Sequence, residues 1–216
     1  KNEWIEETQQ QALQKLEQKG FAEKEVRKLW EGRTEDYFLR ESVTDIEWHT
    51  EAIAHHANPD EPLILIRDPQ QSAFEGATQI FVRMRAHNHA FAAVVTLLDQ
   101  LNLNIQDARL YSSSGEFTND TYYVLNENLE PIGNDDERRT QIWQTLHDEL
   151  AHNIDNFPSI AQRRTARELK HFTMPTRTSM ANDIRSGSTM LEVISPDRPG
   201  LLARIARVFI EFGIRL

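Results

Sequence analysis

The sequence predicts an α+β protein: a helical N-terminal segment, then a βαββαβ unit, then the start of a second such unit. Three observations support this. Helical periodicity dominates residues 3–57, strand-like and helical patterns alternate from 76 to 181, and residues 187–216 repeat residues 76–105 without a gap. A repeat of this kind indicates that one supersecondary unit is used twice.

The repeat is visible residue by residue. GATQIFVRMRAHNHAFAAVVTLLDQLNLNI aligns with GSTMLEVISPDRPGLLARIARVFIEFGIRL at a constant offset of 111. Apolar positions match along the whole alignment, and identical residues stand at Gly76/Gly187, Thr78/Thr189, Val82/Val193 and Ala92/Ala203. The second copy is expected to be truncated, because the chain ends where its second strand would begin.

The helical segment is expected to span residues 1–60. Apolar residues such as Leu13 and Leu16 share one helix face, and Gly20 is a typical stop. A second helix is predicted at about 22–31. A third begins at Thr44, which has capping-box spacing to Glu47. Residues 58–75 are interpreted as an irregular boundary that contains a short apolar run at 63–66.

The first βαββαβ unit is expected to span residues 76–181. Ile80, Val82 and Met84 alternate as in a strand with one buried face, and a helical pattern covers about 91–101. Strands at about 103–113 and 116–125, a helix at about 136–152, a long linker at 153–170 and a fourth strand at about 171–180 follow. This order is that of a ferredoxin-like two-layer sandwich.

The second unit, residues 187–216, contains only a strand, a helix and the start of another strand. In a ferredoxin-like sheet the first strand is central, and its partners would lie beyond Leu216. We therefore expect the strand around Leu191 and Val193 to pair with the sheet of the first unit or with a second chain.

Composition excludes several functional classes. The net charge is −10, which disfavours nucleic acid and anionic membranes as partners. No apolar run is long enough for a transmembrane helix. The chain has no cysteine, which excludes thiol chemistry and fits a reducing cytoplasm.

No catalytic residues and no metal site are predicted for this chain. The glycines are too widely spaced for a phosphate-binding loop. His49, His55 and His56 are interpreted as exposed helix polarity rather than as metal ligands. The dipeptide His147-Asp148 lacks flanking ligands, and the basic run at 163–170 is interpreted as a solvated linker.

The loop at 195–201 is the strongest candidate for a binding site, because it joins a strand directly to a helix start. Backbone N–H groups at a helix start suit a carboxylate, and Asp197 could accept a hydrogen bond from an ammonium. Gly200 permits close approach and Pro199 rigidifies the turn. In the alternative interpretation, Asp197 only caps the helix. The candidate ligand-binding residues are Asp197, Arg198, Pro199, Gly200 and Leu201.

This unit resembles the ACT domain, a βαββαβ regulatory module, and SPDRPGLLARIARVF resembles its signature loop and helix. A longer resemblance covers nearly the whole chain. DYFLRESVTDIEWHTEAIAHH, PLILIR, FAAVVTLLDQLNLNIQDARLYSS and FTNDTYYVL resemble, in this order, the C-terminal part of the bifunctional uridylyltransferase/uridylyl-removing enzymes that act on nitrogen regulatory protein PII.

The resemblance implies a cytoplasmic bacterial sensor of nitrogen status. In this family an upstream nucleotidyltransferase domain uses UTP and Mg²⁺ to uridylylate PII, and a central HD domain removes the UMP. The tandem ACT units bind glutamine and switch between the two activities. The implied partners are therefore glutamine, PII, the upstream catalytic domains and, through the ACT units, a second copy of the chain. No cofactor is expected within this chain itself.

The first copy departs from the family pattern at its loop. Ala86 stands where the second copy has Asp197, and Asn88 and His89 replace Pro199 and Gly200. An ammonium would lack its carboxylate partner there. Asn88 and His89 are therefore weaker candidates for ligand binding.

Two other functions remain open from the sequence. One is an ACT regulator of a biosynthetic enzyme that binds a different amino acid. The other is an interaction module in which the ACT units only dimerise. A panel of amino acids would separate the first from a glutamine sensor, and a concentration-dependent mass without a ligand response would favour the second.

Overall fold

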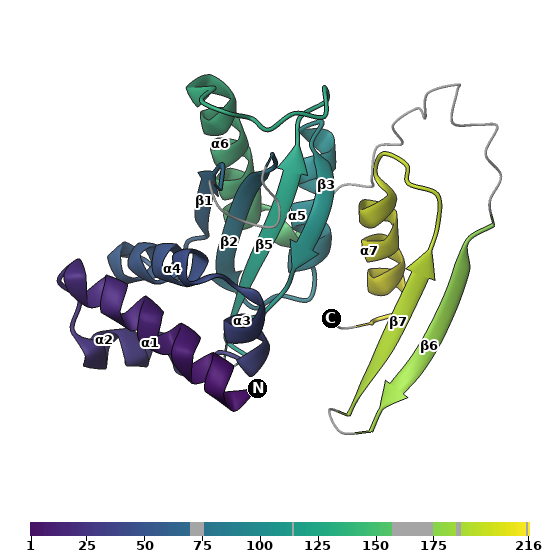
Figure 1. Cartoon of the computed structure of the whole chain (residues 1–216). Helices are drawn as coiled ribbons and strands as arrows, with labels where there is room; N and C mark the ends of the chain where they lie inside the picture. Colours follow the sequence, from purple (N-terminus) through teal and green to yellow (C-terminus); the bar gives the residue numbers. More distant parts are fainter. Residues whose placement is uncertain (70–75, 114, 157–174, 185–186, 215) are drawn as a thin grey trace.

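The structure is a computed structural model that describes residues 1–69, 76–113, 115–156, 175–184, 187–214 and 216. It contains a helical segment, a main antiparallel sheet covered by two helices, and a separate two-stranded sheet with one helix (Figure 1). The α+β class is therefore confirmed. No helix in the described ranges combines the length and the hydrophobicity that a membrane span needs.

The helical segment comprises four helices: α1 (Asn2–Gln18), α2 (Glu23–Trp30), α3 (Glu35–Arg40) and α4 (Val43–His55). Ala12, Leu13 and Leu16 of α1 form the buried face and pack in a core with residues of α2, α3 and α4. Helices α1 and α2 confirm the two helices that the periodicity predicted, whereas α3 was not predicted.

The predicted start of α4 was wrong by two residues. Ser42, not Thr44, is the N-cap, and it forms the capping box with Asp45 rather than with Glu47. The Ser42 hydroxyl accepts from the Asp45 N–H at 3.1 Å, and the Asp45 carboxylate accepts from the Ser42 N–H at 3.3 Å. Two overlapping polar pairs had equivalent spacing, and local pattern alone did not separate them.

The main sheet has the strand order β1-β2-β5-β3, with β4 paired to β5, and all its pairs are antiparallel. Its strands are β1 (Leu63–Arg67), β2 (Thr78–Arg85), β3 (Asn104–Arg109), β4 (Ser112–Ser113) and β5 (Phe117–Leu125). Helices α5 (Ala90–Gln100) and α6 (Asp136–His152) cover one face, and a short 3₁₀ turn, η1 (Ile154–Asn156), follows α6.

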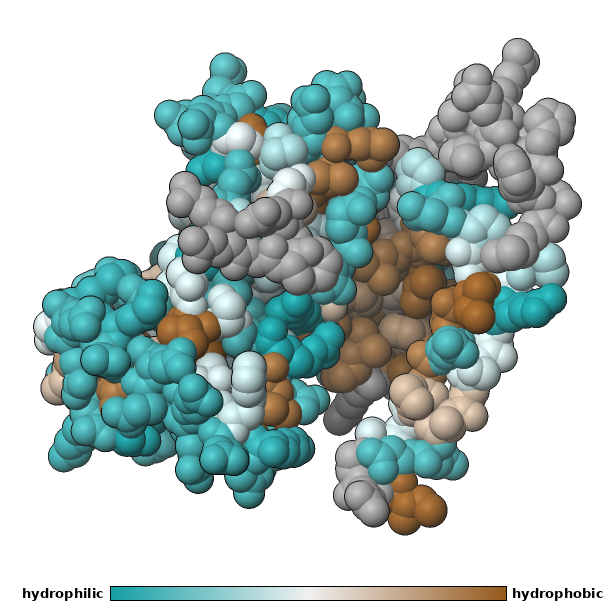
Figure 2. All heavy atoms as spheres, in the orientation of Figure 1, coloured by the Kyte–Doolittle hydropathy of each residue, from teal (hydrophilic) through white to brown (hydrophobic). Residues whose placement is uncertain are grey.

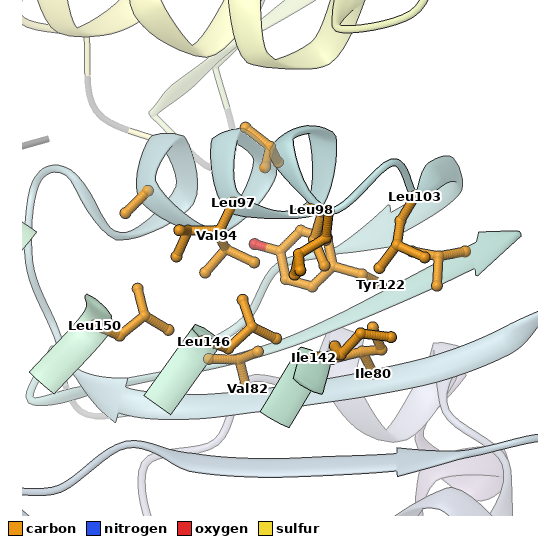
Figure 3. Packing of buried hydrophobic residues seen from close by; sticks show 14 of the residues in the cluster. Ile80, Val82, Val94, Leu97, Leu98, Leu103, Tyr122, Ile142, Leu146 and Leu150 are labelled. Carbon is orange, nitrogen blue, oxygen red and sulfur yellow. The ribbon is translucent and has the colours of Figure 1, made fainter. Parts of the chain in front are cut away.

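The core of this unit lies between the sheet and its two helices (Figure 3). Ile80 and Val82 project from β2, and Tyr122 projects from β5 beside them, because Ile80 and Tyr122 are register partners. From the helices, α6 contributes Ile142, Leu146 and Leu150, and α5 contributes Val94, Leu97 and Leu98 (Figure 3). These side chains are almost completely removed from water, which is the main source of stability in such a layer.

The fourth strand of the expected unit is in a different place. Residues 171–180 were predicted to complete the first sheet, but β6 (Arg177–Asp183) pairs with β7 (Ser188–Ile194) in the second sheet. The position beside β2 is taken by β1, from the segment interpreted as an irregular boundary. The first sheet therefore begins at Leu63, before the predicted unit, and its βαββαβ topology is not confirmed.

The prediction for β7 was also wrong. It neither joins the first sheet nor requires a second chain, since β6 supplies its partner in register from Arg177↔Ile194 to Asp183↔Ser188. The second unit is completed by α7 (Leu201–Glu211), as Figure 1 shows.

The repeat is confirmed at the level of individual hydrogen bonds. At the helix starts, the N–H of Ala90 donates to the carbonyl of His87, and the N–H of Leu201 donates to that of Arg198. At the helix ends, Asn102 and Gly213 both adopt left-handed conformations, with φ of 60° and 63°. Residues at the same offset thus make matching hydrogen bonds, although the N-caps differ in conformation, with φ of −97° at His89 and 73° at Gly200. Strands β1 and β6 extend the repeat by one preceding strand.

The two units meet through their helices. Every residue of α5 from Ala92 to Asp99 is buried, because α7 covers the face that the sheet leaves open. Ala203 and Ala206 of α7 belong to the main core and are each 1% exposed. Small side chains at i and i+3 allow the two helices to approach closely.

The opposite face of the first sheet packs on the helical segment through polar and aromatic groups. His49 of α4 stacks on Phe81 of β2, with ring centroids 4.0 Å apart. The Gln79 amide donates to Asp45 Oδ1 at 2.9 Å, and Arg67 Nη2 donates to the same oxygen at 2.6 Å. The helical segment is thus fixed to the sheet by buried polar contacts.

Candidate functional site

The loop at 195–201 connects β7 to α7, as predicted. The Ser195 and Thr176 hydroxyls lie 3.0 Å apart, which ties the start of the loop to the residue before β6. The N–H of Leu201 donates to the Arg198 carbonyl at 3.0 Å and closes the turn before the helix. The loop is therefore held at both ends.

Gly200 is required by both conformation and space. It is the N-cap of α7 and has φ of 73°, a left-handed conformation that residues with a side chain rarely adopt. A β-carbon at this position would lie 3.2 Å from Oδ2 and 3.4 Å from Oδ1 of Asp99, on helix α5. The close approach predicted for Gly200 is thus made to the first unit of the same chain.

Asp197 does not cap the helix. The N-cap of α7 is Gly200, and no side chain supplies a capping hydrogen bond. The Asp197 carboxylate is exposed and makes no hydrogen bond or ion pair with the described residues. The alternative role that the sequence left open for this residue is therefore excluded, and the carboxylate is free to bind a donor from solution.

The remaining loop residues differ in their exposure to solvent. Arg198 and Leu201 are half-buried, and Pro199 is exposed. They lie beside the start of α7, where the first backbone N–H groups of a helix carry partial positive charge.

Asp99 is a residue that sequence reasoning missed. It is 7% exposed, and its carboxylate lies beside Gly200 at the start of α7. An acidic group at this position complements the partial positive charge of the helix start. The candidate site is thus formed by both units, and no signal in the sequence pairs Asp99 with residues so distant along the chain.

The equivalent loop of the first unit has a different environment. His89 is the N-cap of α5 and has no side-chain capping bond, and Asn88 lies next to it in the turn. His87 Nδ1 accepts from the His89 N–H at 3.1 Å, and His87 Nε2 lies 2.8 Å from Asp155 Oδ1 in η1. Neither Asn88 nor His89 is brought to the loop at 195–201 by any contact that the structure records.

His87, His89 and Asp155 are close enough to be considered as metal ligands. One ligand atom from each lies within 4.8 Å of the other two. However, the His89 N–H already occupies His87 Nδ1, so the proton of a neutral His87 lies on Nε2, facing Asp155. This arrangement is satisfied without an ion.

The histidines of α4 do not converge on a common point. His49 is completely buried, which corrects its interpretation as exposed polarity, and its Nδ1 lies 3.0 Å from the Tyr37 hydroxyl. His55 packs edge-on against Phe21. On α6, His147 stacks on Trp143 with ring centroids 4.7 Å apart. These contacts agree with structural roles for His49, His55 and His147.

A family model described as the fifth domain of uridylyltransferase GlnD matches residues 1–52. The chain is 44% identical over 214 residues to the bifunctional uridylyltransferase/uridylyl-removing enzyme of Stutzerimonas stutzeri, and 45% identical over 216 residues to that of Pseudomonas fluorescens. These alignments cover 99% and 100% of this chain and 24% of each relative, so the chain spans about a quarter of their length. No solved structure matches the chain.

Proposed function

Because the chain is homologous over its whole length to the C-terminal quarter of the bifunctional uridylyltransferase/uridylyl-removing enzymes, we propose that it is the regulatory, amino-acid-sensing part of such an enzyme. Its two repeated units are ACT units, and glutamine is the effector. The parent enzyme modifies and demodifies PII in the cytoplasm, with Mg²⁺ serving the catalytic domains outside this chain.

One observation carries the site of this proposal. Asp197 is an exposed carboxylate without a partner among the described residues, on a loop held beside a helix start. It can accept hydrogen bonds from the ammonium of a free amino acid. Arg198, Pro199, Gly200 and Leu201 form the surrounding surface, and Arg198 supplies a cation for the ligand's carboxylate.

The position of the loop suggests how binding would be transmitted. Gly200 lies against Asp99 on α5, so a ligand at the loop acts at the junction of the two units. Binding shifts the arrangement of the units only if the ligand binds one arrangement better than the other. Coupling free energies of this kind are about 1–3 kcal/mol.

Calorimetric titration with glutamine tests the proposal on the whole chain and on the Asp197→Asn variant. We expect saturable binding to the wild type and a roughly tenfold or greater loss in the variant, since one charge-assisted hydrogen bond is removed. Asp148→Asn, on the exposed side of α6, is the matched control and should bind like the wild type.

Equal binding by wild type and Asp197→Asn would contradict the assignment of the site. Binding of another amino acid in preference to glutamine would indicate a different ACT regulator. If no amino acid binds and the molecular mass in solution rises with protein concentration, the chain is a dimerisation module instead.

A further inference from the structure

The contact between the helical segment and the first sheet contains buried polar atoms that are not hydrogen-bonded. Seven such side-chain atoms have no partner in the part of the chain that the structure describes. They are Arg33 Nε and Nη1, Glu41 Oε2, His49 Nε2, Asn119 Nδ2 and Oδ1, and Thr121 Oγ1. Nearly all buried polar groups of folded proteins are hydrogen-bonded, so this arrangement carries a large desolvation cost.

Three of these residues meet where α4 covers the sheet. His49 of α4 stacks on Phe81 of β2, and Thr121 of β5 is the register partner of Phe81. Asn119 lies two residues from Thr121 and therefore projects from the same face of β5. The unpaired atoms of the helical segment and of the sheet thus face one contact from both sides.

The other two residues extend the same contact. Glu41 is tied to the first unit, because its Oε1 accepts from the Tyr111 hydroxyl at 2.9 Å, while its Oε2 stays unpaired. The Arg33 guanidinium lies 4.3 Å from the centre of the Tyr37 ring, and the Tyr37 hydroxyl lies 3.0 Å from His49 Nδ1. A polar network that is only partly satisfied is a weak point of a buried contact.

The two sides of this contact have separate hydrophobic cores. The core of the helical segment takes its buried residues from α1 to α4 and adds Tyr111 from the first unit. The main core lies between the sheet and helices α5, α6 and α7, and no described residue belongs to both cores. Each side would therefore keep its own core if the two separated. Contacts between units that are not strongly hydrophobic usually permit relative motion.

A single short stretch of chain joins the helical segment to the first sheet. Helix α4 ends at His55 and β1 begins at Leu63, and residues 57–61 between them are exposed. A few residues between two elements can absorb the change in backbone angles that a hinge requires. The connection at 56–62 therefore permits the helical segment to move without disturbing either core.

We propose that the helical segment, α1 to α4, separates from the first sheet as one body, with residues 56–62 as the hinge. Separation exposes the seven unpaired atoms to water, which supplies the missing hydrogen bonds. It also breaks the hydrogen bonds that Asp45 accepts from Arg67 and Gln79, and water replaces these partners as well. In the regulatory role proposed above, such motion would link the ligand-binding units to the helical segment. That consequence, unlike the separation itself, rests on the proposed function.

Thiol labelling of the whole chain measures the separation, because the chain has no cysteine and each introduced cysteine is unique. Three completely buried positions serve as probes. They are Thr121→Cys in the contact, Ala93→Cys in the main core and Ala12→Cys in the core of the helical segment. We expect Thr121→Cys to react at least about tenfold faster than the other two, because only the contact opens without unfolding.

Asn119→Leu tests the physical cause of the separation. Leucine is similar in size and removes two unpaired polar atoms, so this variant should slow the labelling of Thr121→Cys about fivefold or more. Thr118→Val is the matched control. Thr118 Oγ1 is also buried without a partner among the described residues, but Thr118 is the register partner of Met84 and faces the main core. It should leave the labelling of Thr121→Cys unchanged.

Equal labelling of all three probes would overturn the proposal, since the contact would then open only when the whole chain unfolds. Labelling of Ala12→Cys as fast as that of Thr121→Cys would also overturn it, because the helical segment would unfold rather than detach. Equal effects of Asn119→Leu and Thr118→Val would exclude the unpaired atoms as the cause. No amino acid is present in these measurements, so their outcome is independent of glutamine binding.

Discussion

His49 and Asp120 are buried on opposite faces of the first sheet. Burial shifts their pKa values in opposite directions. Burial lowers the pKa of His49 to about 3, so this ring stays neutral between Tyr37 and Phe81. Burial raises the pKa of Asp120 to about 7, although the Tyr111 N–H donates to its carboxyl group. In each case removal from water disfavours the charged form.

Asp120→Asn should remove the contribution of Asp120 to the pH dependence of the unfolding free energy. The folded-state pKa of Asp120 is raised, so its contribution is fully present below about pH 4 and is lost as the pH rises through 7. Asparagine does not titrate. We expect the unfolding free energy of the variant, relative to the wild type, to improve by about 4 kcal/mol between pH 4 and pH 8. Urea denaturation at both pH values measures this difference, and a constant difference would refute it.

At the scale of elements, the contact between α5 and α7 depends on small residues. Gly200, Ala203 and Ala206 recur every three residues along α7, and the two alanines are buried in the main core. Because Gly200 lies beside Asp99, near the end of α5, helix α7 begins where α5 ends. Leu202 packs against the same core. The contact therefore has little room for larger side chains.

Ala206→Leu should disrupt this helix pair. Three additional carbon atoms at a position that is 1% exposed force side chains out of their rotamers or separate the helices. Such overpacking costs about 1–3 kcal/mol. Thermal unfolding should detect the loss, whereas Arg204→Ala, on the exposed side of α7, should change stability by less than about 0.5 kcal/mol. Equal effects of the two substitutions would argue against tight packing.

At the scale of the whole molecule, the two copies of the repeat differ in what surrounds them. Strand β2 has partners on both sides and is largely buried, whereas β7 has a single partner, β6, and a mostly exposed surface. Hydrophobic residues gather over α7 and β7 on the face drawn in Figure 2. The exposed apolar residues of this unit include Met190, Ile194, Val208 and Phe212.

The two-stranded sheet should therefore open more readily than the first. A hairpin of two strands is only marginally stable, and local opening exposes its amides to exchange. We expect the amides of β7 that bond to β6 to exchange more than about tenfold faster than those of β2. Hydrogen exchange followed by mass spectrometry resolves the two strands. Equal protection would mean that β7 is covered in solution.

Several elements could be predicted from local pattern. Helix α6 spans Asp136–His152, as its periodicity predicted, because that signal acts within a few residues. The β2–α5 and β7–α7 pairs follow from the repeat, and their hydrogen bonds match at the same offset. The homology of the chain was also visible in its motifs.

Strand pairing could not be predicted in the same way. The run LILIR at Leu63–Arg67 is too short for periodicity to distinguish a strand from a boundary, and only its contact with β2 makes it one. The strand predicted at about 171–180 was assigned to the wrong sheet, because its residues 177–180 belong to β6 and pairing depends on the partner that a strand meets in space. The linker predicted at 153–170 lies largely outside the described residues.

The sequence by itself determined most of the helices, the repeat, the loop at 195–201 and the family resemblance, since these depend on neighbouring residues and on composition. Only the tertiary structure decided which strands pair, that Asp99 lies beside Gly200, and that Glu41 is buried with an unsatisfied oxygen. These features arise from contacts between segments distant in sequence. The free energy of such contacts depends on what each segment meets in space, which local pattern does not encode.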